Sequence, residues 1–218
     1  MTGRFLLVFI FVLSLLVSSN AQQVTKYDLR SLAENHKLQV VNRELKINDT
    51  SNRSVYLSAH ENDGLAWIEG LDFANGIIEL DIKGKDVLQR SFAGVAFHGS
   101  DNTTFDVVYF RPFNFLTSDP VRKIHAVQYV SLPKYDWEKL RNEQNGKYEK
   151  AVTPAPNPNE WFHTKIEIAF PTVKVYVNGN KEPSLVVEQL NATKSGKLGL
   201  WVGNNADGNF ANLTVQKK

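Results

Sequence analysis

The chain of 218 residues carries 25 basic and 23 acidic side chains, so its formal charge of +2 gives no general electrostatic attraction to nucleic acid. It has no cysteine, which excludes disulfides and thiolate metal sites. A chain of this length buries a large core without such cross-links, and it suits one sandwich-type domain.

Residues 1–21 have the pattern of a secretory signal peptide. Arg4 supplies a short basic region, residues 5–17 form an apolar run, and small residues precede the expected cleavage after Ala21. The run is too short to predict a transmembrane helix, although an uncleaved membrane anchor is the alternative. We therefore expect a secreted or periplasmic protein that begins near Gln22 and keeps no membrane span after cleavage.

Short strands separated by turn residues are predicted throughout residues 22–218. The clearest lies at residues 76–83, where Ile78, Leu80 and Ile82 alternate with polar side chains. Strands are expected within residues 38–48, 55–59, 66–69, 76–83, 91–98, 105–111, 125–130, 161–170, 172–178, 184–189, 196–202 and 209–215. The pattern predicts an all-β domain, a two-sheet antiparallel jelly-roll sandwich.

Residues 132–160 interrupt this rhythm. Residues 136–145 are the one stretch with a good helical pattern, and Gly146 is a suitable C-terminal stop. The Pro-rich residues 151–160 cannot join a central strand ladder. We interpret the whole segment as a short helical insertion that lies over one face or rim of the sheet in a single domain.

The second half of the chain carries a recognisable order of motifs: WFHTKIEIAF at 161–170, KVYVNG at 174–179 and GKLGLWVGNNADGNFANLTV at 196–215. This order resembles concanavalin A-like, laminin G-like jelly rolls. It is also similar to the 3-keto-disaccharide hydrolase domain family, once grouped with family-16 glycoside hydrolases. The resemblance covers about residues 66–215 and implies two curved sheets, of which the concave face often binds sugars.

Family-16 glycoside hydrolases carry a Glu-x-Asp-x-Glu signature on one strand. Glu79 and Asp81 match its first two positions, but Lys83 stands at the third. A retaining glycosidase needs two carboxyl groups about 5–5.5 Å apart, and lysine cannot supply the second. We therefore expect a row of polar side chains that faces solvent.

The candidate site lies within residues 105–130. Tyr109 and Arg111 share one face of a strand, while His125 and Tyr129 share a face of the next; Gln128 has the opposite parity and needs a bulge or twist to join them. Polar and aromatic side chains together suit a sugar, which offers C–H faces and hydroxyl groups. The candidate ligand-binding residues are Tyr109, Arg111, Asn114, His125, Gln128, Tyr129 and Trp137.

We predict that Tyr109, Arg111, His125 and Gln128 line one cleft and that Trp137 lies at its rim. The alternative is a buried polar network in which Arg111 neutralises a carboxylate. Trp201 alternates away from its apolar neighbours, so it is expected to face the cleft as well.

A metal site has no local signature in the sequence. His98, His125 and His163 show no zinc-binding spacing, although ligands from separate strands could still converge. The oxygen-rich residues 204–207, with Asp101 and Asn102 elsewhere, make calcium or another divalent metal a candidate cofactor. Turn chemistry explains these residues equally well, and we favour the turn.

Three functions remain open. The leading hypothesis is a secreted carbohydrate-binding jelly roll with a glycan or glycoside ligand. The family resemblance implies a second, a 3-keto-glycoside hydrolase or lyase, in which His125 or His98 would be the base and Arg111 would hold the oxyanion. The third is a non-catalytic structural or protein-interaction domain.

Overall fold

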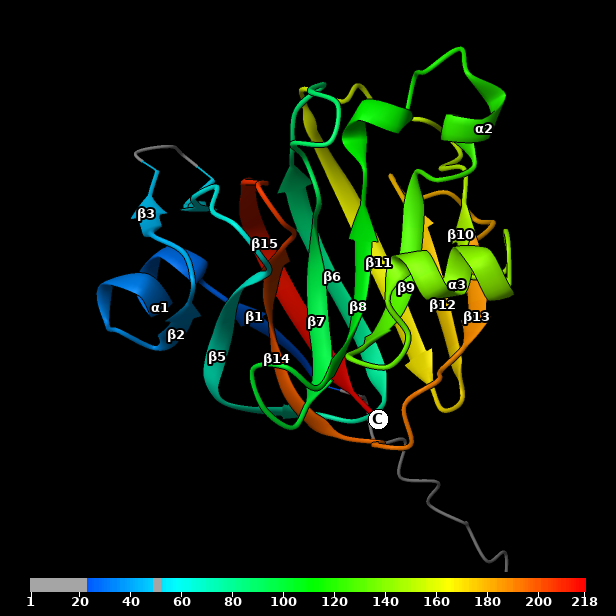
Figure 1. Cartoon of the computed structure of the whole chain (residues 1–218). Coiled ribbons are helices and arrows are strands. Elements are labelled where there is room, and N and C mark those ends of the chain that lie inside the picture. Colours follow the sequence, from blue (N-terminus) through cyan, green and yellow to red (C-terminus); the bar gives the residue numbers. More distant parts are fainter. Residues whose placement is uncertain (1–22, 49–51) are drawn as a thin grey trace, which may run out of the picture.

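The computed structural model describes residues 23–48 and 52–218 (Figure 1). The predicted signal peptide and its cleavage point lie outside these residues. Strands make up 47% of the structure and helices 10%, which confirms the all-β prediction. None of the described helices is long and apolar enough to cross a membrane.

The strands of the described residues form two antiparallel sheets that pack face to face, as predicted (Figure 1). The eight-stranded sheet contains β1 (Val24–Tyr27), β3 (Leu45–Ile47), β4 (Val55–Leu57), β6 (Gly76–Lys83), β11 (Trp161–Ala169), β12 (Thr172–Val177), β13 (Leu185–Glu188) and β15 (Gly208–Lys217). The seven-stranded sheet contains β2 (Leu38–Val41), β5 (Gly64–Phe73), β7 (Ala93–Gly99), β8 (Phe105–Phe110), β9 (Val127–Leu132), β10 (Glu149–Lys150) and β14 (Gly196–Val202).

The strand orders follow a jelly-roll path. They are β13-β12-β11-β6-β15-β4-β3, with β1 paired to β15, and β10-β9-β8-β7-β14-β5-β2. Strands that are distant in sequence, such as β7 and β14, therefore lie side by side.

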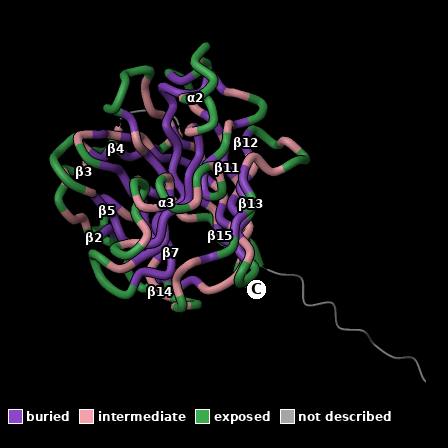
Figure 2. The backbone as a smooth tube through the Cα atoms, turned by 45° about the vertical axis from the view of Figure 1, so that its right-hand side comes forward, coloured by how far each residue is buried: buried purple, intermediate pink, exposed green. Residues whose placement is uncertain are grey.

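The core lies between the sheets and follows from side-chain alternation. In β6, Ile78, Leu80 and Ile82 are fully buried, while the residues between them are only partly covered. Phe110 of β8, in the seven-stranded sheet, packs edge-on against Phe162 of β11, in the eight-stranded sheet, with ring centroids 4.9 Å apart. Buried residues accordingly follow the strands of both sheets, and exposed residues gather in the loops (Figure 2).

Strand β8 is buried on both of its faces. A strand that shows solvent on one side would alternate, so the outer face of the seven-stranded sheet must also be covered near β8. Figure 1 shows α3 (Trp137–Glu143) lying in front of β9 on this side. The cover leaves room for the cleft described below.

The predicted helix in the insertion is α3. Asp136 caps its N-terminus by accepting a hydrogen bond from the Lys139 backbone N–H at 2.8 Å, and Leu140 is its buried contact. The insertion also adds a strand, because β10 pairs with the edge of β9. Three further short helices were not predicted: α1 (Leu29–Glu34), η1 (Pro112–Asn114) and α2 (Pro120–Lys123).

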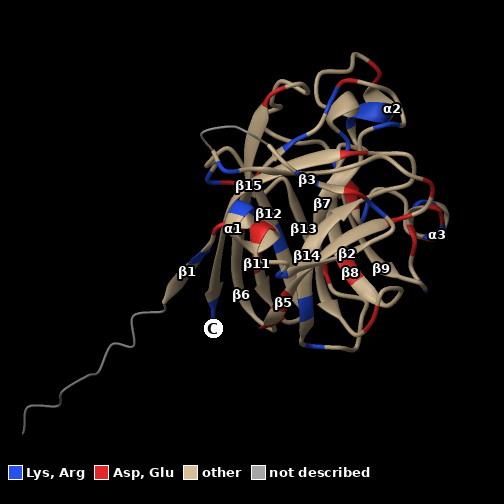
Figure 3. Ribbon diagram, turned by 90° about the vertical axis from the view of Figure 1, so that its left-hand side faces the viewer, with Lys and Arg blue, Asp and Glu red and all other residues tan. Residues whose placement is uncertain are grey.

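Along the ribbon, Lys and Arg positions are interspersed with Asp and Glu positions (Figure 3). The concentration of charge inside the cleft, described next, departs from this pattern.

Candidate functional site

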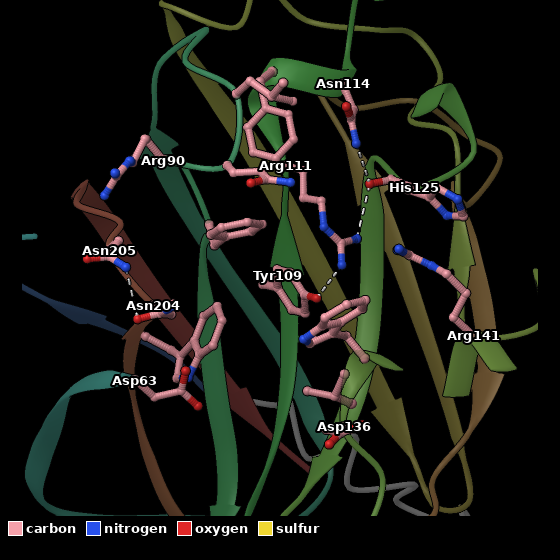
Figure 4. Close-up of a pocket in the computed structure, with 18 of the residues that line it drawn as sticks. Asp63, Arg90, Tyr109, Arg111, Asn114, His125, Asp136, Arg141, Asn204 and Asn205 are labelled. Atoms are coloured by element: carbon pink, nitrogen blue, oxygen red, sulfur yellow. Dashed lines mark hydrogen bonds between the residues drawn. The ribbon is translucent and has the colours of Figure 1, made fainter. Parts of the chain in front are cut away.

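A cleft of about 990 Å³ opens on the outer face of the seven-stranded sheet (Figure 4). This volume suits a small-molecule ligand. Strands β8, β9 and β14 contribute its floor, and the walls come from the loops before β5 and β7, the segment after β8, α3 with Asp136 before it, and the loop after β14. Six of the residues expected at the ligand site line it: Tyr109, Arg111, Asn114, His125, Trp137 and Trp201.

Gln128 lies directly beneath this floor. The register of β8 and β9 places it opposite Tyr109, and paired residues of an antiparallel ladder point to the same side. Its Oε1 atom accepts hydrogen bonds from the Tyr109 hydroxyl at 2.7 Å and from Arg111 Nη2. Gln128 is fully buried, so it supports the cleft and does not line it.

Gln128 reaches the side of Tyr109 without the bulge or twist that its parity was expected to require, because the β8–β9 ladder is regular there. The residue out of step is His125, which precedes β9 and therefore escapes the alternation of the strand. Its backbone carbonyl accepts hydrogen bonds from Arg111 Nη1 and Asn114 Nδ2, each at 3.1 Å (Figure 4). These two contacts hold His125 at the cleft wall.

Tyr129 and His98 do not line the cleft. Tyr129 pairs with Val108 and faces the opposite sheet, where its hydroxyl accepts the Leu190 N–H at 3.0 Å. His98 is fully buried, with Nε2 2.7 Å from the Ala74 carbonyl oxygen. The expectations of a ligand contact by Tyr129 and of a base at His98 are therefore corrected: both side chains belong to the core.

Glu149 is the central residue that the sequence did not reveal. It lies on β10, is 2% exposed, and receives two hydrogen bonds from Arg141, at 2.9 and 2.7 Å. His125 Nδ1 lies 2.8 Å from its Oε2 atom, and Arg111 Nη1 lies 3.5 Å away. A strand of two residues is too short to show side-chain alternation. The one sequence signal for Glu149 is that it lies in the predicted insertion at residues 132–160.

Arg111 therefore fulfils both of the roles that were weighed for it. It lines the cleft, and it also lies against a buried carboxylate. Its Nη2 atom donates to the Tyr109 hydroxyl at 2.6 Å, and its guanidinium lies 4.8 Å from the centroid of the Tyr109 ring. Such a held guanidinium is preorganised, with little side-chain freedom left to lose on binding.

Burial and the neighbouring charges shift the pKa values of His125 and Glu149. Burial alone would raise the pKa of Glu149, but Arg141, Arg111 and His125 hold it below its ordinary value. Burial lowers the pKa of His125, assisted by Arg141 and Arg111 and opposed by Glu149. The lowered pKa favours the neutral imidazole. Nδ1 lies 2.8 Å from the carboxylate, and the neutral tautomer that carries its proton on Nδ1 would leave the Nε2 lone pair free to accept a proton.

Trp137 and Trp201 contribute aromatic surface to the cleft, beside Leu88, Phe92, Phe113, Val130 and Leu132. Trp137 is 48% exposed at the edge, with the Arg141 guanidinium 5.1 Å from its ring centroid. Trp201 is nearly buried, and its ring centroid lies 4.9 Å from that of Tyr109. Aromatic faces at the rim and on the floor, next to polar side chains, are the combination expected for a sugar ligand.

The oxygen-rich turn is occupied with its own hydrogen bonds. Asp207 forms an ion pair with Lys85 at 2.7 Å, and Asn204 Oδ1 accepts the Asn62 N–H at 2.8 Å. Across residues 23–48 and 52–218, no three histidine or acidic side chains are grouped as a metal site. These contacts agree with the turn interpretation.

The family-16-like residues lie on the other sheet. Glu79 and Asp81 point outward from β6, and His163 lies between them, with Nε2 3.0 Å from Glu79 and Nδ1 2.8 Å from Asp81. They form the expected row of polar side chains, on the side of the molecule away from the cleft.

Fold and cleft together define a jelly roll of the type found in carbohydrate-binding modules and glycosyl hydrolases. The family model of the 3-keto-alpha-glucoside-1,2-lyase-like domain matches residues 23–216. The chain therefore belongs to this family, as the order of its motifs suggested.

Solved structures agree on the fold. The carbohydrate binding module CBM66 from Bacillus subtilis superposes with a TM-score of 0.58 at 16% identity, over 83% of this chain and 96% of that one. A putative glycosyl hydrolase from Parabacteroides distasonis gives 0.53 at 13% identity, over 84% and 89%. No curated protein matches the chain. At such identities the likeness concerns the fold and leaves the activity to be argued from the site.

Proposed function

We propose that the protein is a secreted lyase that binds a 3-keto-α-glucoside in the cleft and cleaves its glycosidic bond by elimination. Membership of the 3-keto-alpha-glucoside-1,2-lyase-like family supports the reaction class. The signal-peptide pattern of residues 1–21 supports secretion.

The reaction needs a base and a place for negative charge. A ketone at C3 of the sugar makes the C2 hydrogen acidic, and its removal as a proton leaves an enolate. The enolate then forms a C1=C2 double bond while the C1–O bond breaks and the electron pair leaves with the glycosidic oxygen. Atoms and electrons balance without an oxidant or reductant.

The single observation that carries the proposal is the His125–Glu149 pair on the cleft wall. A base must be neutral and oriented before it can accept a proton. Burial lowers the pKa of His125 and so favours the neutral base, while the Glu149 carboxylate 2.8 Å from Nδ1 and the hydrogen bonds to the His125 carbonyl favour one position of the residue. A protein that only binds a neutral sugar has no need of this arrangement.

The cleft carries a surplus of positive charge for the enolate. Arg111 and Arg141 share one carboxylate, Glu149, so one guanidinium charge remains uncompensated beside the neutral His125. Arg111 is only 5% exposed, so its charge is poorly screened by water. Positive charge held at the place where an oxyanion develops stabilises the transition state.

The test compares p-nitrophenyl 3-keto-α-glucoside with the unoxidised p-nitrophenyl α-glucoside. The purified protein should release p-nitrophenolate only from the keto sugar, and His125→Gln should lower that rate by about 100-fold or more. His163→Gln, on the opposite sheet, is the matched control and should keep the wild-type rate. Equal rates on the two substrates, or full activity of His125→Gln, would overturn the proposal.

A second candidate is glycan binding without turnover. The exposed Trp137 at the rim favours it, because an aromatic face suits sugar binding whether or not a reaction follows. Calorimetric titration of glycosides into the protein decides between the two. Heat of binding that is lost in Trp137→Ala, with no release of a leaving group from any keto sugar, would support this candidate over the lyase.

A further inference from the structure

Elimination from an α-glucoside needs two proton-transfer groups on opposite sides of the ring. In the chair form, the C2–H bond and the C1–O bond are both axial and point to opposite faces. A base on one wall of the cleft therefore cannot also protonate the departing oxygen. This requirement rests on the proposed lyase activity, in which His125 is the base.

Two carboxyl groups line the described cleft, those of Asp63 and Asp136. Asp136 is engaged at the N-terminus of α3, where its Oδ1 accepts the Lys139 N–H. Glu149 lies beneath the surface against Arg141. Asp63 forms no salt bridge with any described residue and sits on the opposite side of the cleft from His125 (Figure 4).

The backbone around Asp63 is held firmly. Arg43 lies behind it, and its Nη2 atom donates to the carbonyl oxygens of Asn62 at 2.6 Å and Gly203 at 2.9 Å. The Arg43 side chain passes over Gly64, where a Cβ atom would collide with it. Asp63 is thereby fixed between the start of β5 and the end of β14, next to Trp201.

The surroundings also favour the protonated carboxyl. Burial raises the pKa of Asp63 above its ordinary value, and the opposing influences are the Trp201 indole N–H and the Arg43 guanidinium. A bound sugar would remove more water from the same wall and act in the same direction as burial.

We propose that Asp63 is the second catalytic residue and donates a proton to the glycosidic oxygen. His125 takes the C2 proton from one face of the ring. The C1=C2 double bond forms, the C1–O bond breaks, and the departing oxygen takes the Asp63 proton on the other face. Exchange with solvent then returns the proton to Asp63 and removes the one from His125.

The test uses two leaving groups. A p-nitrophenolate leaves without a proton, whereas a methoxide needs one. With Asp63→Asn, turnover of methyl 3-keto-α-glucoside should fall by about 100-fold or more, while turnover of the p-nitrophenyl keto sugar should stay close to the wild-type rate. Asp136→Asn is the matched control, and it should keep the wild-type ratio of the two rates.

An equal loss on both substrates would overturn the proposal and leave Asp63 a positioning residue. If Asp63→Asn does not fold, the pH profile of the wild-type protein gives the same answer. Protonated Asp63 should produce an alkaline fall in rate on the methyl substrate that is absent on the p-nitrophenyl substrate; matching profiles would contradict the role. Failure of the lyase proposal is distinct, because the wild-type protein would then turn over neither substrate.

Discussion

Replacing Glu149 by alanine removes the carboxylate that holds Arg111 and Arg141 together beneath the cleft. Arg111 is 5% exposed, so its charge would remain in a poorly hydrated position. Breaking a buried ion pair by removing one partner costs about 3–5 kcal/mol. The side chain of Arg141 is 30% exposed and can turn to water, so we expect the lower end, about 3 kcal/mol.

Thermal and urea unfolding measure this cost. In a domain of this size, 1 kcal/mol shifts Tm by about 2–4 °C, so Glu149→Ala should lower Tm by about 6–12 °C. The matched control is Glu143→Ala in the same insertion, whose ion pair with Lys139 is exposed and should contribute less than about 1 kcal/mol.

Charge can be separated from shape in the same experiment. Glu149→Gln keeps the size of the side chain and removes only the charge. Combined with Arg141→Gln, it should cost less than the sum of the two single changes, because the surplus charge is removed with its partner. A loss for Glu149→Ala no larger than that of Glu143→Ala would refute the buried charge network.

Three further predictions concern other parts of the molecule. Trp137→Ala should weaken glycoside binding about tenfold, or 1.4 kcal/mol, with little change in Tm, since Trp137 is half exposed; unchanged affinity in calorimetry would remove it from the site. Arg111→Ala should abolish turnover and also lower stability by about 1–3 kcal/mol, because Gln128 loses a donor and Glu149 keeps Arg141 as its one guanidinium partner; loss of turnover at wild-type Tm would mean that the buried network is unimportant for folding. Hydrogen bonds to Asp81 and Glu79 raise the pKa of His163, so the stabilisation from protonated His163 is complete below about pH 6.5 and is lost as the pH rises through the higher pKa of the folded state. In urea unfolding, His163→Gln should have the same free energy of unfolding as the wild type above that range and a lower one below it. A difference that does not change with pH would be inconsistent with this linkage.

The sequence was sufficient for most of the strands and for α3, although β1 and β10 were not predicted. Strand alternation and turn residues are local signals, and the cap Asp136 with Gly146 bounds a helix without tertiary information. The same local reading brought most candidate residues to one cleft, since Tyr109 and Arg111 must leave their strand on the same side.

The sequence did not predict the pairing register of β8 and β9. Alternation says that Gln128 and Tyr129 face opposite ways, but it does not say which of them meets Tyr109 across the ladder. Pairing of Tyr109 with Gln128 sends Tyr129 into the core, and His125 joins the cleft because it lies before the strand. Glu149 and Asp63 were missed for a related reason: each gains its importance from partners distant in sequence, Arg141 with His125 for one and Arg43 with Trp201 for the other.

The fate of the C2 hydrogen tests the central claim most directly. A 3-keto-α-glucoside deuterated at C2 is incubated in ordinary water with the wild-type protein, with His125→Gln, or with buffer alone. Mass spectrometry then compares the deuterium content of the sugar product in the three samples. Removal of the C2 proton predicts a product that has lost its deuterium, formed at a rate that depends on His125. A product that keeps the deuterium would show that the glycosidic bond breaks without proton abstraction, and it would contradict the account.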